Sequence, residues 1–252
     1  MVNAIELESS SERGKNAIPI ILLHGWGKSH KELMPMAELL REVAPVYVLD
    51  LPGFGQSPVP NETWGVKDYA ECVHAYCVEK GLSKIILFGH SFGGRITVVF
   101  SQMYPSMVQK LCLMGAAGLS RKRTLKENVR IKWIKTLSSI ARILETYFGF
   151  STLRNWFREK YGSPDYKNAG PMRNILVKTI NEDLTEFAKQ ITQPALLLWG
   201  ELDTETPVDV GEKYATLIKN STLIVLPGKG HEAYLGTGYN ICAHYIKQFL
   251  AA

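Results

Sequence analysis

The sequence predicts an α/β protein, in which helices cover both faces of a mostly parallel, doubly wound sheet. Short apolar strands alternate with amphipathic helices along the chain, and most strands are unbroken apolar runs. Such runs suit a parallel sheet that is buried on both faces. About 80 residues between residue 114 and residue 195 contain no convincing strand, which predicts a helical insertion.

Six apolar runs are predicted to be strands, at residues 18–23, 46–49, 85–88, 110–114, 195–199 and 223–226. Amphipathic stretches with helical spacing lie between and after them, at residues 34–42, 66–79, 95–103, 210–218 and 239–250. This βαβ order predicts a doubly wound sandwich of helices and sheet.

The insertion is predicted to be a helical cap of residues 119–190 on a core domain of residues 1–118 and 191–252. Apolar residues recur at helical spacing in three stretches of the cap. Trp156 is one of several aromatic residues there that are candidates for lining a substrate pocket, with cap-to-core packing as the alternative. Residues 158–170 are polar and contain glycine and proline, which predicts a loop between cap helices.

Composition restricts the class and the compartment. The chain is 46% hydrophobic and 21% charged, and both values are ordinary for a soluble globular enzyme. We expect no membrane span, because no apolar run approaches about 20 residues, and no secretion signal. The four cysteines lack C-x-x-C spacing, which argues against a zinc site or a disulfide framework and predicts a cytoplasmic location.

The net charge of +5 is concentrated in one segment, since residues 120–190 hold 15 lysines and arginines against 7 acidic residues. Beyond residues 121–123, the basic residues alternate with apolar positions of helical spacing. This pattern fits a solvated helix face, and it leaves open an anionic substrate or an acidic carrier protein as partner. Nucleic acid is not expected as a partner.

The most informative motif is Gly89-His90-Ser91-Phe92-Gly93, a G-x-S-x-G pattern between a predicted strand and a predicted helix. In this context the pattern predicts a strained turn that exposes a nucleophilic serine, here Ser91. A Cβ atom at Gly89 or Gly93 would crowd the turn, where strand and helix nearly touch. We assign His90 a structural role.

A serine hydroxyl needs a histidine base, and an acid that orients the histidine. His231 follows a predicted strand within a glycine-rich loop late in the chain. Asp203 follows the strand of residues 195–199, and its neighbours Glu201 and Glu205 have weaker claims to the acid's role. We therefore predict that Ser91, His231 and Asp203 are catalytic.

Acyl transfer also needs hydrogen-bond donors for the developing oxyanion. The backbone N–H of Phe92, directly after the nucleophile, is one candidate. The loop His24-Gly25-Trp26-Gly27 follows the first predicted strand and offers the N–H of Trp26 as the second. The side chain of Trp26 is a further candidate for the pocket wall, whereas His24 is expected to orient the loop.

These motifs, together with residues 50–57, resemble the α/β-hydrolase superfamily. More narrowly, they are similar to the capped bacterial carboxylesterases, carbon–carbon bond hydrolases and haloperoxidase-like esterases. The order Ser91, Asp203, His231 is that of the superfamily. The resemblance covers residues 18–57, 84–118 and 193–250 and implies a structural role for Asp50. Because the superfamily opens with a hairpin of two longer strands, the short segment before residue 18 predicts a reduced edge of the sheet.

The expected reaction is hydrolysis of a small carboxylic ester through an acyl-enzyme. One alternative is cleavage of a carbon–carbon bond in a vinylogous diketone acid, for which Arg95 or an arginine of the cap is a candidate anchor of the substrate carboxylate. A second alternative is an esterase for a carrier-linked acyl group, similar to the pimeloyl-carrier methyl esterases. A non-catalytic binding protein is disfavoured by the complete residue set. No metal or organic cofactor is expected.

Overall fold

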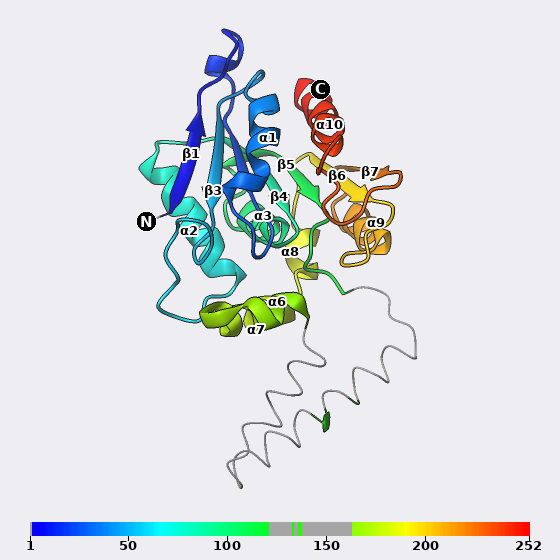
Figure 1. Cartoon of the computed structure of the whole chain (residues 1–252). Helices are drawn as coiled ribbons and strands as arrows, with labels where there is room; N and C mark the ends of the chain where they lie inside the picture. The colour runs from blue at the N-terminus through cyan, green and yellow to red at the C-terminus, as the bar shows by residue number, and fades with distance from the viewer. Residues whose placement is uncertain (1, 121–132, 134–135, 138–162) are drawn as a thin grey trace. The chain divides into compact units, whose positions relative to one another are not determined.

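The computed structural model describes residues 2–120, 133, 136–137 and 163–252. They form a sheet of seven strands in the order β1-β3-β2-β4-β5-β6-β7, and the predicted α/β class is confirmed (Figure 1). β1 pairs antiparallel with β3, and all other neighbouring strands are parallel. The strands are β1 (Asn3–Leu7), β2 (Ile20–Leu23), β3 (Val46–Asp50), β4 (Ile85–His90), β5 (Val108–Met114), β6 (Ala195–Gly200) and β7 (Ser221–Leu226).

The strand order changes direction between β2 and β4. From β2 the chain moves outward to β3, and it then returns to build β4, β5, β6 and β7 on the other side of β2. In open α/β sheets, ligands bind outside the carboxyl ends of the strands at such a switch point. The loops after β2 and β4 are the two that flank this point.

Helices cover both faces of the sheet because alternate strand residues point to opposite sides. One core cluster joins Leu22, Val48 and Phe88 to α1 (His30–Leu40) and α10 (Gly238–Ala251). The neighbouring strand residues Ile21, Leu87 and Leu197 are also fully buried, so they face the other layer of helices. That layer contains α2 (Val66–Glu79), α3 (Phe92–Met103), α8 (Thr185–Lys189) and α9 (Val208–Leu217) (Figure 1).

The N-terminal edge differs from the sequence-based element list. β1 was not predicted, and among the described residues it is the one strand before β2, which agrees with the expected reduced edge. Helix α1 begins at His30, four residues before the predicted start. The backbone N–H of His30 donates a 2.7 Å hydrogen bond to the carboxylate of Asp50, at the end of β3. This cap comes from a distant part of the chain, so helical periodicity does not reveal it.

The chain divides into two compact units, Met1–Arg121 with Val177–Ala252, and Lys122–Leu176. The cap of residues 119–190 stays a prediction, and Trp156 lies outside the described residues. The second unit contains α6 (Pro164–Asn168), so the prediction of a continuous loop at residues 158–170 was wrong. Pro164 occupies the first turn, and the Ser163 hydroxyl accepts a 3.2 Å bond from the N–H of Tyr166, a helix-start pattern readable in the sequence. The remaining described helices are α7 (Arg173–Asn181), η1 (Gly14–Asn16) and η2 (Gly170–Met172).

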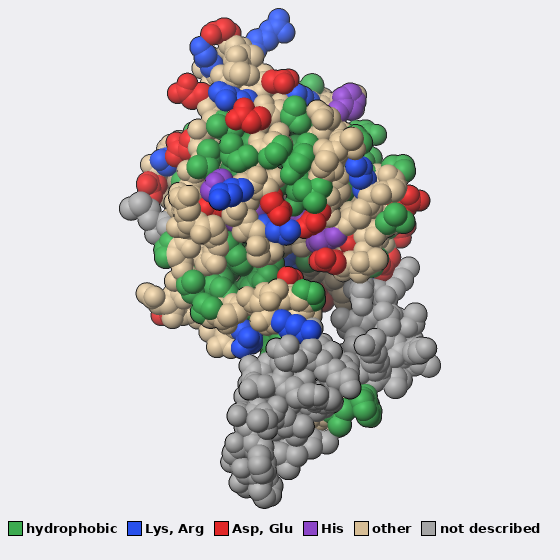
Figure 2. All heavy atoms as spheres, viewed as in Figure 1, with side chains coloured by type: hydrophobic (Ala, Val, Ile, Leu, Met, Phe, Trp, Pro, Cys, Tyr) green, Lys and Arg blue, Asp and Glu red, His purple; other side chains and the backbone are tan. Residues whose placement is uncertain are grey.

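Basic and acidic side chains are interspersed over the described residues on the face drawn in Figure 2, and neither kind forms a continuous patch there. None of the described helices combines the length and the apolar character needed to cross a membrane.

Candidate active site

Ser91 occupies a strained turn between β4 and α3. Its φ and ψ are 49° and −104°, and it is the one residue other than glycine with positive φ in the described part of the chain. Such a conformation costs about 1–3 kcal/mol and persists only where surrounding contacts enforce it. Here the N–H of Ser91 donates to the carbonyl of Met114 at 3.0 Å, and its carbonyl accepts from the N–H of Ala117 at 3.2 Å. The side chain is left partly exposed.

The glycines of the turn have no room for a side chain. A Cβ atom at Gly89 would collide with the carbonyl of Gly93 and the hydroxyl of Thr97, and one at Gly93 would collide with the carbonyls of Leu23 and His24. The predicted crowding is therefore confirmed. It is caused by the close approach of α3 to β4 and to the loop after β2.

We expect Gly93→Ala to lower the free energy of unfolding by about 2 kcal/mol, because overpacking against fixed backbone outweighs alanine's better helix propensity. Urea unfolding followed by circular dichroism measures the change. Gly230→Ala is the matched control, since its Cβ would meet nothing within 4 Å, and it should stay within about 0.5 kcal/mol of the wild type. Equal stabilities for the two variants would contradict this account.

Asp203 and His231 lie in direct contact. Nδ1 of His231 is 2.8 Å from Oδ2 of Asp203, whose side chain is fully buried. The other carboxylate oxygen accepts the backbone N–H groups of Glu205 at 2.9 Å and Thr206 at 2.8 Å. Burial opposes ionisation, but the bonds from His231 and Thr206 outweigh it and lower the pKa of Asp203. Asp203 is therefore an ionised, fixed partner for the imidazole.

The loops that carry these two residues are joined to each other. They follow the neighbouring strands β6 and β7, and the N–H of Leu202 donates to the carbonyl of Lys229 at 2.8 Å. Glu201, one of the weaker candidates for the acid, accepts the N–H of Gly228 at 2.8 Å and so supports the His231 loop. Glu205, the other, lies 3.5 Å from Nε2 of His231, the ring nitrogen opposite to the one Asp203 contacts, and is largely exposed.

The pKa of His231 is raised above its ordinary value of 6.5. Burial favours the neutral ring, but Asp203, Glu205 and Glu232 together outweigh it. A base must be neutral to accept a proton, so kcat/KM should fall as the pH drops through this raised pKa. This decline of kcat/KM at low pH is the acid limb of the pH profile. We expect its midpoint to lie above pH 6.5 when the rates are measured with an uncharged ester from about pH 5 to 9. A midpoint below pH 6.5 would contradict this direction.

The two candidate oxyanion donors lie on adjoining loops. The N–H of Gly93 donates to the carbonyl of His24 at 3.1 Å, and the rings of Trp26 and Phe92 meet edge to face at 5.2 Å. Phe92 is the first residue of α3, where backbone N–H groups have no partner within the helix. Neither the Trp26 nor the Phe92 N–H has a hydrogen-bond acceptor among the described residues. Both groups are thus free to donate to a ligand.

The two buried histidines beside Ser91 support the backbone. The ring of His24 donates from Nδ1 to the carbonyl of Gly25 at 2.7 Å and accepts the N–H of Leu51 at 3.0 Å, and burial lowers its pKa to about 4. Nε2 of His90 donates to the carbonyl of His231 at 3.1 Å, and burial lowers the pKa of His90 to about 3. Both rings are neutral near pH 7 and hold the site's loops together.

Asp50 also serves the backbone near the site. Its buried carboxylate accepts from the ring of His30 at 2.8 Å, the amide of Asn3 at 2.8 Å and the N–H of Gln56 at 2.9 Å. These bonds join β3, the start of α1 and the loop after β3, which fits the structural role expected from the resemblance.

Arg95 is buried in α3 and hydrogen-bonded to protein. Its guanidinium donates to the carbonyls of Ile180 at 3.2 Å and Glu182 at 3.0 Å, at the carboxyl end of α7. Burial lowers its pKa. Its use as an anchor for a substrate carboxylate stays a prediction, and these two bonds would compete with that use.

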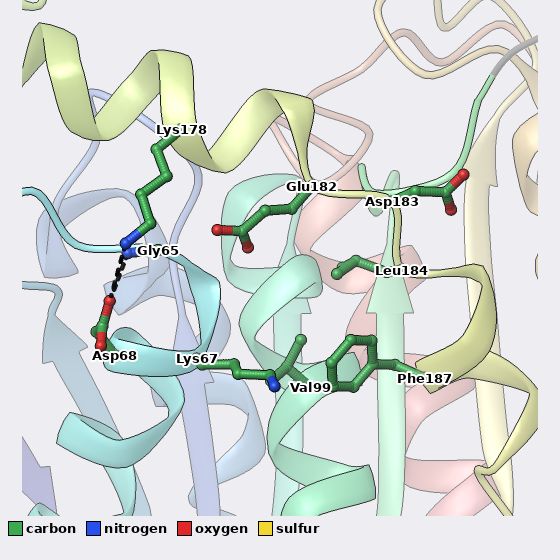
Figure 3. A pocket seen from close by; sticks show the side chains of 9 residues that line it. All are labelled: Gly65, Lys67, Asp68, Val99, Lys178, Glu182, Asp183, Leu184 and Phe187. Carbon is green, nitrogen blue, oxygen red and sulfur yellow. Dashed lines mark hydrogen bonds and ion pairs between the residues drawn. The ribbon is translucent and has the colours of Figure 1, made fainter.

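A hollow of about 450 Å³ lies between α2, α3 and residues 178–187 (Figure 3). Its charged walls are largely paired: Lys178 lies 3.6 Å from Asp68, and the N–H of Val66 donates to Glu182 at 3.0 Å. Ser91, His231 and Asp203 are not among its described lining residues. No group of three potential metal-binding side chains occurs within the described ranges.

A mostly parallel sheet of this order, with a serine turn after β4 and an Asp–His pair after β6 and β7, defines a hydrolytic α/β enzyme. The chain belongs to the α/β-hydrolase family, whose model, described as the alpha/beta hydrolase fold, matches residues 18–236.

Relatives and solved structures agree with this assignment. A pimeloyl-[acyl-carrier protein] methyl ester esterase from Pseudoalteromonas atlantica is 25% identical, over 85% of this chain and 88% of its own. An esterase from Exiguobacterium antarcticum superposes with a TM-score of 0.74 at 21% identity, covering 100% and 96% of the two chains. A meta-cleavage product hydrolase from Pseudomonas fluorescens gives 0.72 at 19% identity, covering 99% and 94%. The two structural likenesses show the fold.

Proposed function

We propose that the protein is a serine hydrolase that cleaves a small carboxylic ester through an acyl-enzyme. The observation that carries the proposal is the 2.8 Å contact between His231 and the buried carboxylate of Asp203, on loops joined to the strained turn at Ser91. A neutral imidazole whose Nδ1–H is held by a carboxylate presents Nε2 as a base. The free N–H groups of Trp26 and Phe92 supply the donors that acyl transfer needs.

In the proposed mechanism, the Ser91 hydroxyl attacks the ester carbonyl while Nε2 of His231 takes its proton. The N–H groups of Trp26 and Phe92 stabilise the oxyanion, and Asp203 stabilises the imidazolium. The imidazolium then protonates the leaving alcohol, and the acyl group stays on Ser91. Water attacks the acyl-enzyme by the same steps, which releases the carboxylic acid and restores the serine.

A second candidate function is hydrolysis of an ester in an acyl chain carried by an acidic protein. It is favoured by the likeness to a pimeloyl-[acyl-carrier protein] methyl ester esterase and by the excess of basic residues at positions 120–190. In this case the acidic carrier would bind near basic side chains, so activity would fall as salt screens the attraction.

Carbon–carbon bond cleavage has less support. That reaction needs a cation for the substrate carboxylate, and Arg95, the candidate outside the cap, donates to two backbone carbonyls instead. The likeness to a meta-cleavage product hydrolase rests on the fold.

The proposal is tested by measuring hydrolysis of p-nitrophenyl esters from acetate to decanoate, together with labelling by a fluorophosphonate and peptide mapping. We expect ester hydrolysis and a label on Ser91. A label on Ser91 without activity on any of these esters would turn the search to carrier-linked and carbon–carbon bond substrates. The absence of both label and activity would overturn the serine-hydrolase proposal.

A further inference from the structure

Thr206 contacts both members of the Asp–His pair, and nothing in the serine motif or in the order of the three candidates points to it. Its hydroxyl oxygen lies 2.8 Å from Oδ2 of Asp203 and 3.2 Å from Nδ1 of His231. It also lies 3.0 Å from the carbonyl oxygen of Gly115, at the end of β5. Thr206 is buried, so water does not compete freely for these contacts.

The backbone of Thr206 is fixed on two sides. Its N–H donates to Oδ1 of Asp203 at 2.8 Å, within the turn that Asp203 makes with its own chain. Its carbonyl accepts a 2.7 Å bond from the indole N–H of Trp199, a fully buried residue of β6. The turn therefore delivers the hydroxyl to the Asp–His contact as part of a rigid support.

The distances indicate where the single hydroxyl proton lies. The hydroxyl has one proton and two oxygen acceptors in reach, Oδ2 of Asp203 at 2.8 Å and the carbonyl of Gly115 at 3.0 Å. The carboxylate is the nearer of the two and carries a negative charge, which makes it the stronger acceptor. Thr206 therefore donates to Oδ2 of Asp203, and a lone pair of its oxygen faces the Nδ1–H of His231. Oδ2 then has two donors, the imidazole and the hydroxyl, and Oδ1 has two backbone donors.

We infer that Thr206 is a positioning residue of this site, whose hydroxyl shares the charge of Asp203 with His231 and fixes the imidazole ring. This inference rests on the proposed function. The carboxylate cannot rotate away while all four of its bonds are made, so His231 keeps Nδ1 toward Asp203 and Nε2 available as the base. Removing the hydroxyl takes away one of the four bonds that fix the orientation of the carboxylate, and it leaves Oδ2 a stronger acceptor for the imidazolium proton.

The direction of the pH effect follows from the groups around His231. Asp203 contacts Nδ1, Glu205 lies near Nε2, and Glu232 and the neutral ring of His90 lie nearby. Glu232 is itself paired with Lys28, which reduces its effect on His231. Without the Thr206 hydroxyl, Asp203 has one donor fewer and holds the imidazolium more strongly. The acid limb of kcat/KM should then move to higher pH.

The test compares Thr206→Val, which keeps the shape but removes the hydroxyl, with Thr206→Ser, which keeps the hydroxyl. With a p-nitrophenyl ester we expect Thr206→Val to lose about tenfold in kcat at nearly constant KM, because a less well oriented base weakens the transition state and not substrate binding. The midpoint of the acid limb of its kcat/KM profile should move to higher pH by about half a unit. Thr206→Ser should stay within about twofold of the wild type, with the wild-type limb.

The possible outcomes distinguish a failure of this inference from a failure of the proposed serine-hydrolase function. If wild-type protein neither hydrolyses esters nor takes the fluorophosphonate label, the proposed function fails. If wild-type protein is active and Thr206→Val matches it in kcat and in acid limb, the positioning role is overturned and the function stands. A loss of kcat in both Thr206→Val and Thr206→Ser, with the acid limb of kcat/KM unchanged, would also overturn the positioning role. Such a result would indicate a general structural effect of changing this residue. Should Thr206→Val unfold, Thr206→Cys replaces it, because a thiol is a weak donor of similar size, and the same readouts apply.

Discussion

Ser91→Ala is expected to abolish ester hydrolysis, with kcat reduced by about a million-fold or to the detection limit and KM little changed. Removing the nucleophile of a serine hydrolase costs about this much, because the base and its carboxylate act only through the serine. Residual hydrolysis would come from the oxyanion donors alone. The change removes one oxygen from a partly exposed side chain, so thermal unfolding should shift by only a few degrees.

The measurement is initial-rate kinetics on the preferred p-nitrophenyl ester, with fluorophosphonate labelling of the same preparations. Ser106→Ala is the control, since Ser106 is exposed and lies outside the candidate site. It should keep full activity and take the label at Ser91. A Ser91→Ala protein that retained more than about 1% of wild-type kcat, after purification away from host esterases, would assign the nucleophile elsewhere.

The central sheet could be predicted because its strands are buried on both faces. β2, β4 and β6 are entirely buried, and each contains an unbroken apolar run, at residues 20–23, 85–88 and 195–199. The grouping of the candidate site, though not its catalytic role, could be predicted for a related reason. Its residues follow parallel strands directly, and the carboxyl ends of such strands meet at one edge.

The elements that were missed depend on contacts across the fold. β1 has one sheet neighbour and no buried residue, so its sequence is not an unbroken apolar run. The start of α1 depends on Asp50, 20 residues from His30 in the chain. Nothing in the sequence distinguishes Thr206 from the other threonines. Its contacts with Asp203 and His231 arise only because the turn after β6 places its hydroxyl there. Local patterns do not encode such pairings.

Asp203→Asn is expected to lower kcat by about 10⁴-fold while the protein stays folded, and the hydrogen bonds of Asp203 give the reason. The backbone N–H groups of Glu205 and Thr206 both point at Oδ1, so the amide of the variant must place its oxygen there. Its NH₂ group then takes the place of Oδ2, facing Nδ1 of His231. A donor in that position forces Nδ1 to be the acceptor and moves the ring proton to Nε2.

An imidazole with its proton on Nε2 cannot take the proton of Ser91, so the variant would have every side chain in place and the wrong tautomer. Both kcat and the rate of fluorophosphonate labelling should therefore fall together. The free energy of unfolding in urea should change little, because the oxygen at the Oδ1 position keeps its two backbone donors. Asp183→Asn, at an exposed carboxylate outside the pair, should leave both rates unchanged. If Asp203→Asn kept more than about a tenth of wild-type kcat, another acid would have to orient His231. Glu205 would be the first to test, because its carboxylate already lies 3.5 Å from the other ring nitrogen and a flip of the imidazole would exchange the two partners.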